Sequence, residues 1–185
     1  MRSKSSVRVA SIIVGLVAVA LVALLATRGT STPIASQIVG QAAPNFSGIT
    51  LDGSTYELSR HRGQWVVVNF FATWCTECRL EDPQIQQFVD QNKGQPVSVV
   101  SLAYSDDAES IRSYFAESGA TWPVIPSETG RVALDYGVTR VPESYIVAPS
   151  GLVVQGFFGG VTAAELEAVI AANGGMSVAD PTITP

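Results

Sequence analysis

Residues 66–83, near the middle of the chain, constrain the fold more than any other part of the sequence. They begin with a nearly continuous apolar run, Val66-Val67-Val68-Asn69-Phe70-Phe71. Such a run of β-branched and aromatic side chains predicts a strand covered on both faces, as in an α/β sheet. A helix is expected to begin soon after it, at about Cys75, and to include Pro83. The strand would deliver its carboxyl end to a site at that point.

The only two cysteines of the chain, Cys75 and Cys78, fall in the first turn of this predicted helix. Residues three apart are neighbours on a helix face, so the two sulfurs can bond, and Glu81 can lie beneath Cys78. Unpaired N–H groups and the positive end of the helix dipole favour a thiolate at a helix N-terminus. We therefore expect Cys75 to be the exposed, attacking thiol and Cys78 to be the more buried, resolving thiol.

Two other roles compete with redox activity for this cysteine pair. A zinc site needs about four ligands, and beyond the two cysteines the chain offers only His61 as a nitrogen or sulfur ligand of that kind. A purely structural disulfide is the stronger alternative, although closing so short a loop removes little chain entropy. We expect a redox-active Cys75–Cys78 disulfide with no metal and no bound cofactor.

The first 28 residues differ in composition from the rest of the chain. Three basic residues precede an uncharged, apolar run at residues 9–26, and Arg28 follows it. The run is at the lower limit for a membrane-spanning helix, and the basic flank orients its N-terminal side to the cytoplasm. We expect residues 1–28 to be an uncleaved anchor rather than a removed signal peptide. The protein would then be a single-pass protein of the cell membrane with its remaining residues on the extracytoplasmic side.

The rest of the chain divides into a linker, one domain and a tail. Residues 29–42 have no apolar periodicity and are predicted to be a tether, residues 43–174 to be the domain, and residues 175–185 to be a loose tail. After Arg28 the chain has seven basic and sixteen acidic residues, a net charge of −9. This charge disfavours nucleic acid and anionic lipid surfaces as partners.

The domain is predicted to have an α/β fold. Asp52-Gly53 indicates a hairpin turn, and the patterns at residues 106–109 and 162–165 resemble capping boxes that open helices. Parallel strands joined by helical crossovers would lie beside an antiparallel pair. The expected strands are 46–49, 55–58, 66–71, 97–104, 144–148 and 152–158, with a short extended piece at 122–125, and the expected helices are 75–89, 106–119, 130–136 and 162–173.

Several motifs carry a resemblance to a known family. The sequence resembles the thioredoxin fold over about residues 43–173. The resemblance rests on Trp74-Cys75-Thr76-Glu77-Cys78 followed by Pro83, and on Val141-Pro142 before a strand-turn-strand-helix ending. The Ala43-Pro44-Asn45-Phe46 opening and the insertion at residues 104–130 resemble the membrane-anchored TlpA, ResA and CcmG (DsbE) group of thiol-disulfide oxidoreductases. The resemblance implies a thioredoxin fold with an N-terminal β-hairpin extension and a central insertion, preceded by one transmembrane helix.

The resemblance also implies roles for residues outside the cysteine pair. Pro142 resembles the family's cis-proline, which exposes the backbone of Val141 to an extended substrate, although an ordinary turn proline is the alternative. Glu81 resembles an acidic residue that tunes or deprotonates the cysteines, and Glu143 resembles an acidic residue beside the cis-proline. Either glutamate could instead be a solvated surface carboxylate.

The residues around the cysteines depart from the usual thioredoxin pattern. Asn69 stands where many thioredoxins have a buried aspartate, so Glu81 becomes the better candidate for proton handling. Thr76-Glu77 replaces the common Gly-Pro between the cysteines, and Trp74 precedes them. The charge of Glu77 should raise the pKa of the Cys75 thiol and make the couple less oxidising.

The function implied by the resemblance is that of a disulfide reductase. Its substrate would be a protein thiol or disulfide such as the haem-binding cysteines of apocytochrome c. A membrane electron donor of the CcdA or DsbD type would then re-reduce the Cys75–Cys78 pair. An oxidase or isomerase like DsbE is the alternative within the same chemistry. A thioredoxin-fold peroxidase would need a threonine where Ala72 stands, and a non-enzymatic adaptor is the remaining alternative.

Overall fold

The computed structural model of the chain describes residues 13–21, 38–126 and 129–175. Two units can be distinguished, Met1–Thr32 and Pro33–Pro185. In the first unit residues 13–21 are helical, and no helix in any of the described ranges is long and apolar enough to cross a membrane. The predicted anchor and linker fall mostly outside the described residues, as does nearly all of the predicted tail, so their boundaries remain predictions.

The second unit is built on a five-stranded mixed sheet with the order β5-β4-β3-β6-β7, preceded by a separate hairpin of β1 and β2. Strands β3, β4 and β5 are parallel, and β6 runs antiparallel to both β3 and β7. This arrangement confirms the predicted parallel crossovers beside an antiparallel pair. The strands are β1 (Ser47–Ile49), β2 (Thr55–Glu57), β3 (Trp65–Phe71), β4 (Val97–Ala103), β5 (Val124–Ile125), β6 (Glu143–Val147) and β7 (Val153–Phe158).

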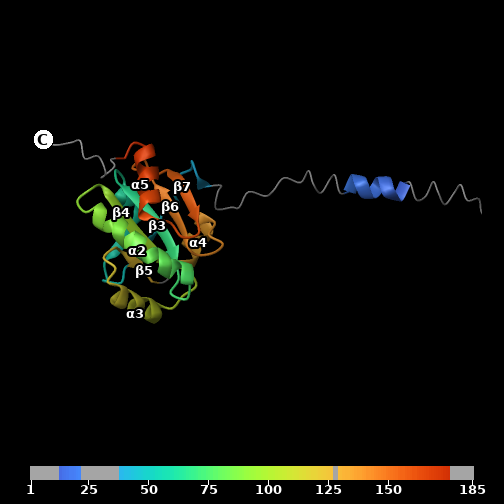
Figure 1. The fold of residues 1–185 in the computed structure, drawn as a ribbon. Helices are drawn as coiled ribbons and strands as arrows, with labels where there is room; N and C mark the ends of the chain where they lie inside the picture. The colour runs from blue at the N-terminus through green and yellow to red at the C-terminus, as the bar shows by residue number, and fades with distance from the viewer. Residues whose placement is uncertain (1–12, 22–37, 127–128, 176–185) are drawn as a thin grey trace, which may run out of the picture. The chain divides into compact units, whose positions relative to one another are not determined.

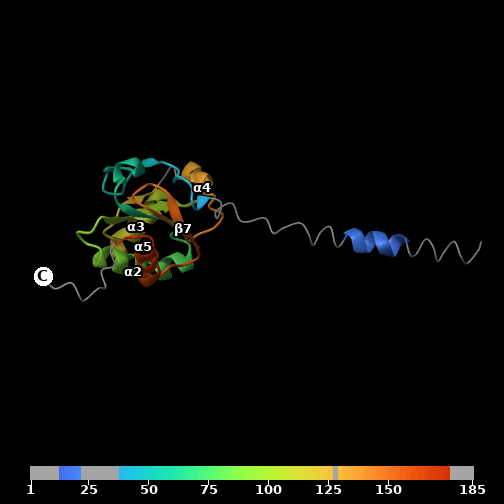
Figure 2. The ribbon, with the colours of Figure 1, turned by 90° about the horizontal axis from the view of Figure 1, so that it is seen from above.

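Helices cover both faces of the sheet. Figures 1 and 2 show α2 and α5 on one face, and α4 with the β1–β2 hairpin on the other. The α3 helix lies beyond β5 at one end of the unit (Figure 1). The helices are α2 (Thr76–Gln91), α3 (Ala108–Ser118), α4 (Gly130–Tyr136) and α5 (Ala163–Ala172), with a short 3-10 helix η2 (Leu58–His61).

The central strand β3 is buried along its whole length, as its apolar run predicts. Side chains alternate between the two faces of a strand, so β3 contributes to two separate cores. Val67 and Phe71 pack beneath α2 and α5, whereas Val68 and Phe70 pack with Tyr136 on the other face. Because both faces are covered, the carboxyl end of β3 is held in a fixed position relative to the start of α2.

The predicted capping boxes of two helices have different outcomes in the structure. The Thr162 capping box of α5 is present as predicted, but α3 is capped by Asp107 alone, whose carboxylate accepts from the backbone N–H groups of Glu109 and Ser110. The predicted capping box at residues 106–109 is therefore wrong. Asp106 is used elsewhere, because its carboxylate accepts a hydrogen bond from the backbone N–H of Thr73.

Candidate active site

The two cysteines lie at the junction of β3 and α2 and form a disulfide with a Cα–Cα distance of 5.3 Å. Cys75 is the N-cap of α2, with extended backbone angles that stop the helix from starting earlier. Its Sγ accepts a hydrogen bond of 3.1 Å from the backbone N–H of Cys78. The N-cap sulfur is thus where a negative charge is best stabilised, by unpaired N–H groups and by the helix dipole.

The exposure of the cysteines differs in part from the prediction. Cys78 is more buried than Cys75, as expected, with 2% of its surface exposed. The expectation that Cys75 is exposed is wrong for the disulfide form, since only 6% of it is accessible. Its sulfur is bonded to Cys78 on one side and lies 3.6 Å from the backbone carbonyl oxygen of Val141 on the other.

The loop before β6 lies against the cysteine pair. The Val141–Pro142 peptide bond is cis, as the resemblance implies. Pro142 is buried, whereas Val141 is partly exposed. The carbonyl oxygen of Pro142 accepts a hydrogen bond from the backbone N–H of Gly159, which fixes this loop to the end of β7. The backbone of Val141 is therefore held beside Cys75.

Glu81 lies one turn after Cys78 on α2 and is buried, with 3% of its surface exposed. Its carboxylate accepts hydrogen bonds from the Asn69 amide at 3.1 Å and from the Val161 backbone N–H at 3.0 Å. Burial raises the pKa of Glu81 to about 7, while these two donors act to lower it and the neighbouring charge of Asp82 raises it. A carboxyl group that titrates near neutral pH can accept and return a proton in this site.

Glu143 is also buried but lies on the other face of the sheet. Its carboxylate accepts a hydrogen bond of 2.8 Å from the hydroxyl of Tyr145 and two of 3.3 Å from the backbone N–H and hydroxyl of Thr139. Tyr145 belongs to the core beneath α4, whereas Ser144 faces the Glu81 side. Glu143 thus supports the loop that carries Val141 rather than sharing a site with Glu81.

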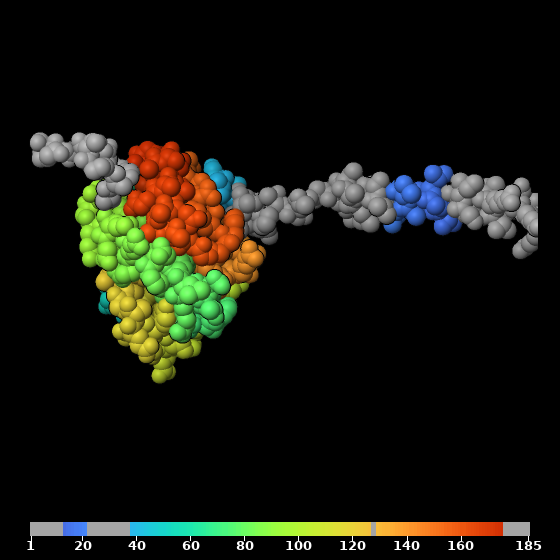
Figure 3. All heavy atoms as spheres, viewed as in Figure 1, coloured from blue at the N-terminus to red at the C-terminus, as the bar shows by residue number. Residues whose placement is uncertain are grey.

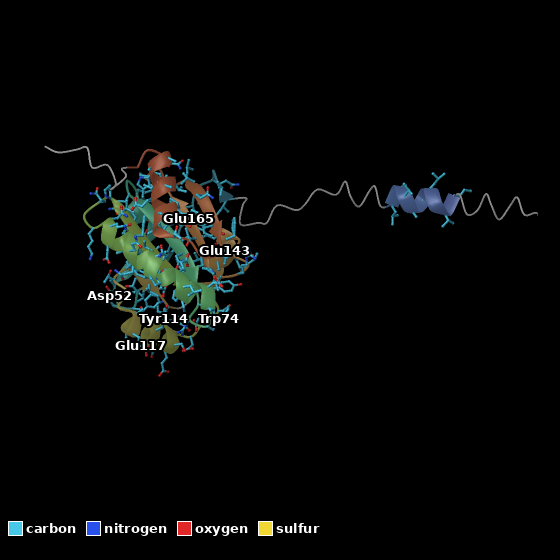
Figure 4. The ribbon with its side chains drawn as sticks, viewed as in Figure 1. Asp52, Trp74, Tyr114, Glu117, Glu143 and Glu165 are labelled. Atoms are coloured by element: carbon cyan, nitrogen blue, oxygen red, sulfur yellow. A yellow bond between two sulfur atoms is a disulfide. The ribbon has the colours of Figure 1, made fainter. Side chains whose placement is uncertain are left out.

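The residues beside and between the two cysteines are exposed. Trp74 is 61% exposed, and its indole N–H donates to the carbonyl oxygen of Ser105. Thr76 and Glu77, in the first turn of α2, are exposed. In Figure 4 the labelled Trp74 lies at the N-terminal end of α2. These three side chains are available to a partner protein that approaches the disulfide.

The insertion that carries α3 holds the turn before Cys75 in place. Asp106 accepts the Thr73 N–H at 2.6 Å, and the Arg79 Nε donates to the Thr73 carbonyl oxygen at 2.8 Å. The Arg79 guanidinium also lies 4.9 Å from the centre of the Tyr114 ring, and the Tyr114 hydroxyl donates to Asp82. In Figure 3 the surface of α2 lies between α5 and α3, so both neighbours restrain the helix.

Comparison with known proteins assigns the chain to a family. Residues 39–155 match the AhpC/TSA family. The chain belongs to this family. Within it, the chain is 32% identical over 124 residues to the thiol-disulfide oxidoreductase ResA of Bacillus subtilis, covering 66% of this chain and 69% of that one. The resemblance to the ResA group, first inferred from motifs, is confirmed.

Solved structures of similar proteins have the same fold as this chain. A thiol:disulfide interchange protein of the thioredoxin family from Chlorobium tepidum superposes with a TM-score of 0.66 at 28% identity, covering 74% of this chain and 95% of that one. A putative thiol:disulfide interchange protein DsbE from the same organism superposes with a TM-score of 0.65 at 27% identity, over 71% of this chain and 94% of that one. The predicted thioredoxin-like α/β fold is confirmed.

Several residues of the site were not found by sequence reasoning. The sequence marks Asn69 only as a departure from thioredoxins, yet in the structure its amide links Glu81 to Ser101 and Ser144. Polar residues inside an apolar strand are a usable signal, since a buried polar group requires partners. Asp106 gave no such signal, because its partner is distant in the sequence. No group of three or more histidine, cysteine, aspartate or glutamate residues in the described part of the chain could hold a metal ion.

Proposed function

We propose that this protein is an extracytoplasmic disulfide reductase that uses the Cys75–Cys78 couple, with the haem-binding cysteine pair of apocytochrome c as its substrate. The observation that carries the proposal is the position of Cys75 as the N-cap of α2, bonded to Cys78 and 3.6 Å from the Val141 carbonyl oxygen. The names of the ResA relatives support the class of reaction.

The reaction proceeds in two exchanges. The Cys75 thiolate attacks one sulfur of the substrate disulfide, and the other substrate sulfur leaves as a thiolate. Cys78 then loses its proton and attacks the Cys75 sulfur, which releases the second substrate thiolate and forms the Cys75–Cys78 disulfide. The substrate gains two electrons and the enzyme dithiol loses two. Glu81 accepts the Cys78 proton, since it lies one turn further along α2 and titrates near neutral pH.

The charge near the Cys75 thiolate supports the reductive direction that we propose. Glu77 lies in the first turn of α2, where its negative charge opposes the stabilisation of the Cys75 thiolate by the helix N-terminus. A less stabilised thiolate makes the couple less oxidising. The extracytoplasmic side lacks a glutathione pool, so re-reduction requires a membrane electron donor of the CcdA or DsbD type. Residues 1–28 would hold the domain at the membrane beside that donor.

The test of this proposal is the partner trapped by Cys78→Ala. Without the resolving thiol, Cys75 should remain joined to its substrate in a mixed disulfide, which a reductant releases and mass spectrometry identifies. Cys75→Ala is the matched control, since it lacks the attacking sulfur and should trap nothing. Recovery of apocytochrome c and a membrane reductase supports the proposal. A broad set of secreted proteins would instead indicate an oxidase or isomerase, and the absence of any adduct would overturn the proposal.

A further inference from the structure

A chain of hydrogen bonds crosses the sheet from its β5 edge to Glu81. The Trp122 indole N–H donates to the Ser101 hydroxyl at 2.8 Å, and that hydroxyl donates to the Asn69 Oδ1 at 3.0 Å. The Asn69 Nδ2 then donates to Glu81 at 3.1 Å and to the Ser144 hydroxyl at 3.0 Å. The strand register places Asn69 directly between Ser101 on β4 and Ser144 on β6.

The members of this chain are buried, so water cannot replace a lost bond. Ser144 has no exposed surface, Ser101 is 1% exposed and Asn69 is 2% exposed. Trp122 is 7% exposed, and its ring packs edge to face on Phe115 with centroids 5.9 Å apart. A buried polar group that loses its partner is left unsatisfied, which costs more than the bond itself contributes.

The chemistry of the donors sets the direction of the chain. An indole N–H can only donate, so the Ser101 oxygen accepts from Trp122, and its own hydrogen is left to donate to Asn69. The Asn69 oxygen is thereby occupied, and its amide N–H groups must point to Glu81 and Ser144. If the amide were reversed, its oxygen would face the Glu81 carboxylate and the Ser101 hydroxyl would lose its acceptor.

We propose that Trp122 and Ser101 are positioning residues that hold the Asn69 amide as a donor toward Glu81 and so favour the ionised form of that carboxyl group. This inference rests on the proposed role of Glu81 in taking the proton of Cys78. It places control of the proton acceptor at Trp122, which lies outside the cysteine motif, next to β5 at the edge of the sheet.

Of the other groups around Glu81, only the Val161 backbone N–H also favours the ionised form, and no side chain of the sheet sets its position. From the loop before α5, the Val161 N–H donates to the second carboxylate oxygen, but a backbone group is unaffected by the amide of Asn69. On α2 itself, the charge of Asp82 disfavours ionisation, and Cys78 is in the disulfide. On β6, Ser144 faces Asn69 rather than donating to Glu81. The Asn69 amide is thus the side chain through which the sheet acts on the carboxylate.

The test is the titration of the Glu81 side-chain carboxyl carbon by NMR in the oxidised full-length protein, where neither cysteine titrates. Ser101→Ala should raise the pKa of Glu81 by about 0.5 to 1 unit, because the amide no longer has a fixed orientation. Trp122→Phe keeps an aromatic ring, although a smaller one, and removes the N–H donor, so it should shift the pKa of Glu81 in the same direction by less. The ascending limb of the pH profile of disulfide reduction should shift to higher pH together with the pKa of Glu81.

Two further variants are the controls. Ser98→Ala makes the same chemical change on β4 away from Asn69, and Ser101→Thr keeps the hydroxyl, so both should leave the titration where it is. An unchanged midpoint in both Ser101→Ala and Trp122→Phe, or an equal shift in Ser98→Ala, would overturn the inference. If the Glu81 titration midpoint shifts but Cys78→Ala traps no partner, the inference about Trp122 and Ser101 holds and the proposed function fails. If the partner is trapped but the midpoint does not move, only the inference about Trp122 and Ser101 fails.

Discussion

Burial raises the pKa of Glu81 from its ordinary 4.5 to about 7, so the folded protein binds a proton that the unfolded chain releases. Folding is then favoured by this group below pH 4.5, and the advantage is lost as the pH rises from 4.5 through about 7. The difference between these two pKa values corresponds to roughly 3 kcal/mol of unfolding free energy.

Glu81→Gln should remove this pH dependence. We expect the wild-type protein to lose roughly 3 kcal/mol relative to the variant between pH 4.5 and 8, measured by denaturant unfolding of the oxidised forms. Asp82, whose pKa is also raised by burial, is present in both proteins, so the difference between the two stability curves reports Glu81 together with its interaction with the Asp82 charge. Parallel stability curves for the two proteins over this interval would contradict the assigned environment of Glu81.

The residues of the site differ in how far they could be predicted. The pairing of Cys75 and Cys78 at the start of α2 follows from local helix geometry, because three-residue spacing and an N-cap position depend on neighbours in the sequence. The burial of Glu81 and Glu143 depends on Asn69, Tyr145 and other residues contributed by separate strands. Glu143 faces away from Glu81 because side chains alternate along a strand. Ser144, the next residue on β6, points to the face on which Glu81 lies, so Glu143 points to the other face.

At the scale of the element, we expect the first turn of α2 to set the reactivity of Cys75. The helix N-terminus stabilises the thiolate, and the exposed Glu77 opposes it. Glu77→Gln should therefore make the couple more oxidising by about 10 to 20 mV, measured by equilibration with glutathione. Glu117→Gln, which removes an exposed carboxylate from α3, is the matched control and should leave the potential unchanged. A lower potential in Glu77→Gln would contradict this argument.

The elements themselves were largely predictable, and the exceptions have physical causes. The apolar run of β3 and the capping box of α5 are local patterns, and both are present. The start of α3 was misplaced because Asp106 and Asp107 are equally good N-caps by sequence. A contact with Thr73, 33 residues away, uses Asp106 and leaves Asp107 to cap the helix.

At the scale of the whole molecule, the proposed chemistry requires only the second unit. The described parts of Pro33–Pro185 contain the sheet, both cores and the disulfide. A chain lacking residues 1–37 should fold and reduce a soluble disulfide at the rate of the full-length protein, but should not partition with membranes when expressed in cells. Equal partitioning of both chains with membranes would contradict the assignment of residues 1–28 as the anchor.

The central claim is that Cys75 is the reactive sulfur of the reduced protein. Alkylation with iodoacetamide over a range of pH, with the labelled residue located by peptide mass spectrometry, tests it most directly. Cys75 should react first, with a rate that rises as its thiol ionises, and Cys78 should remain protected by burial. Labelling of Cys78 before Cys75, or no labelling of Cys75 at any pH at which the protein is folded, would contradict the account.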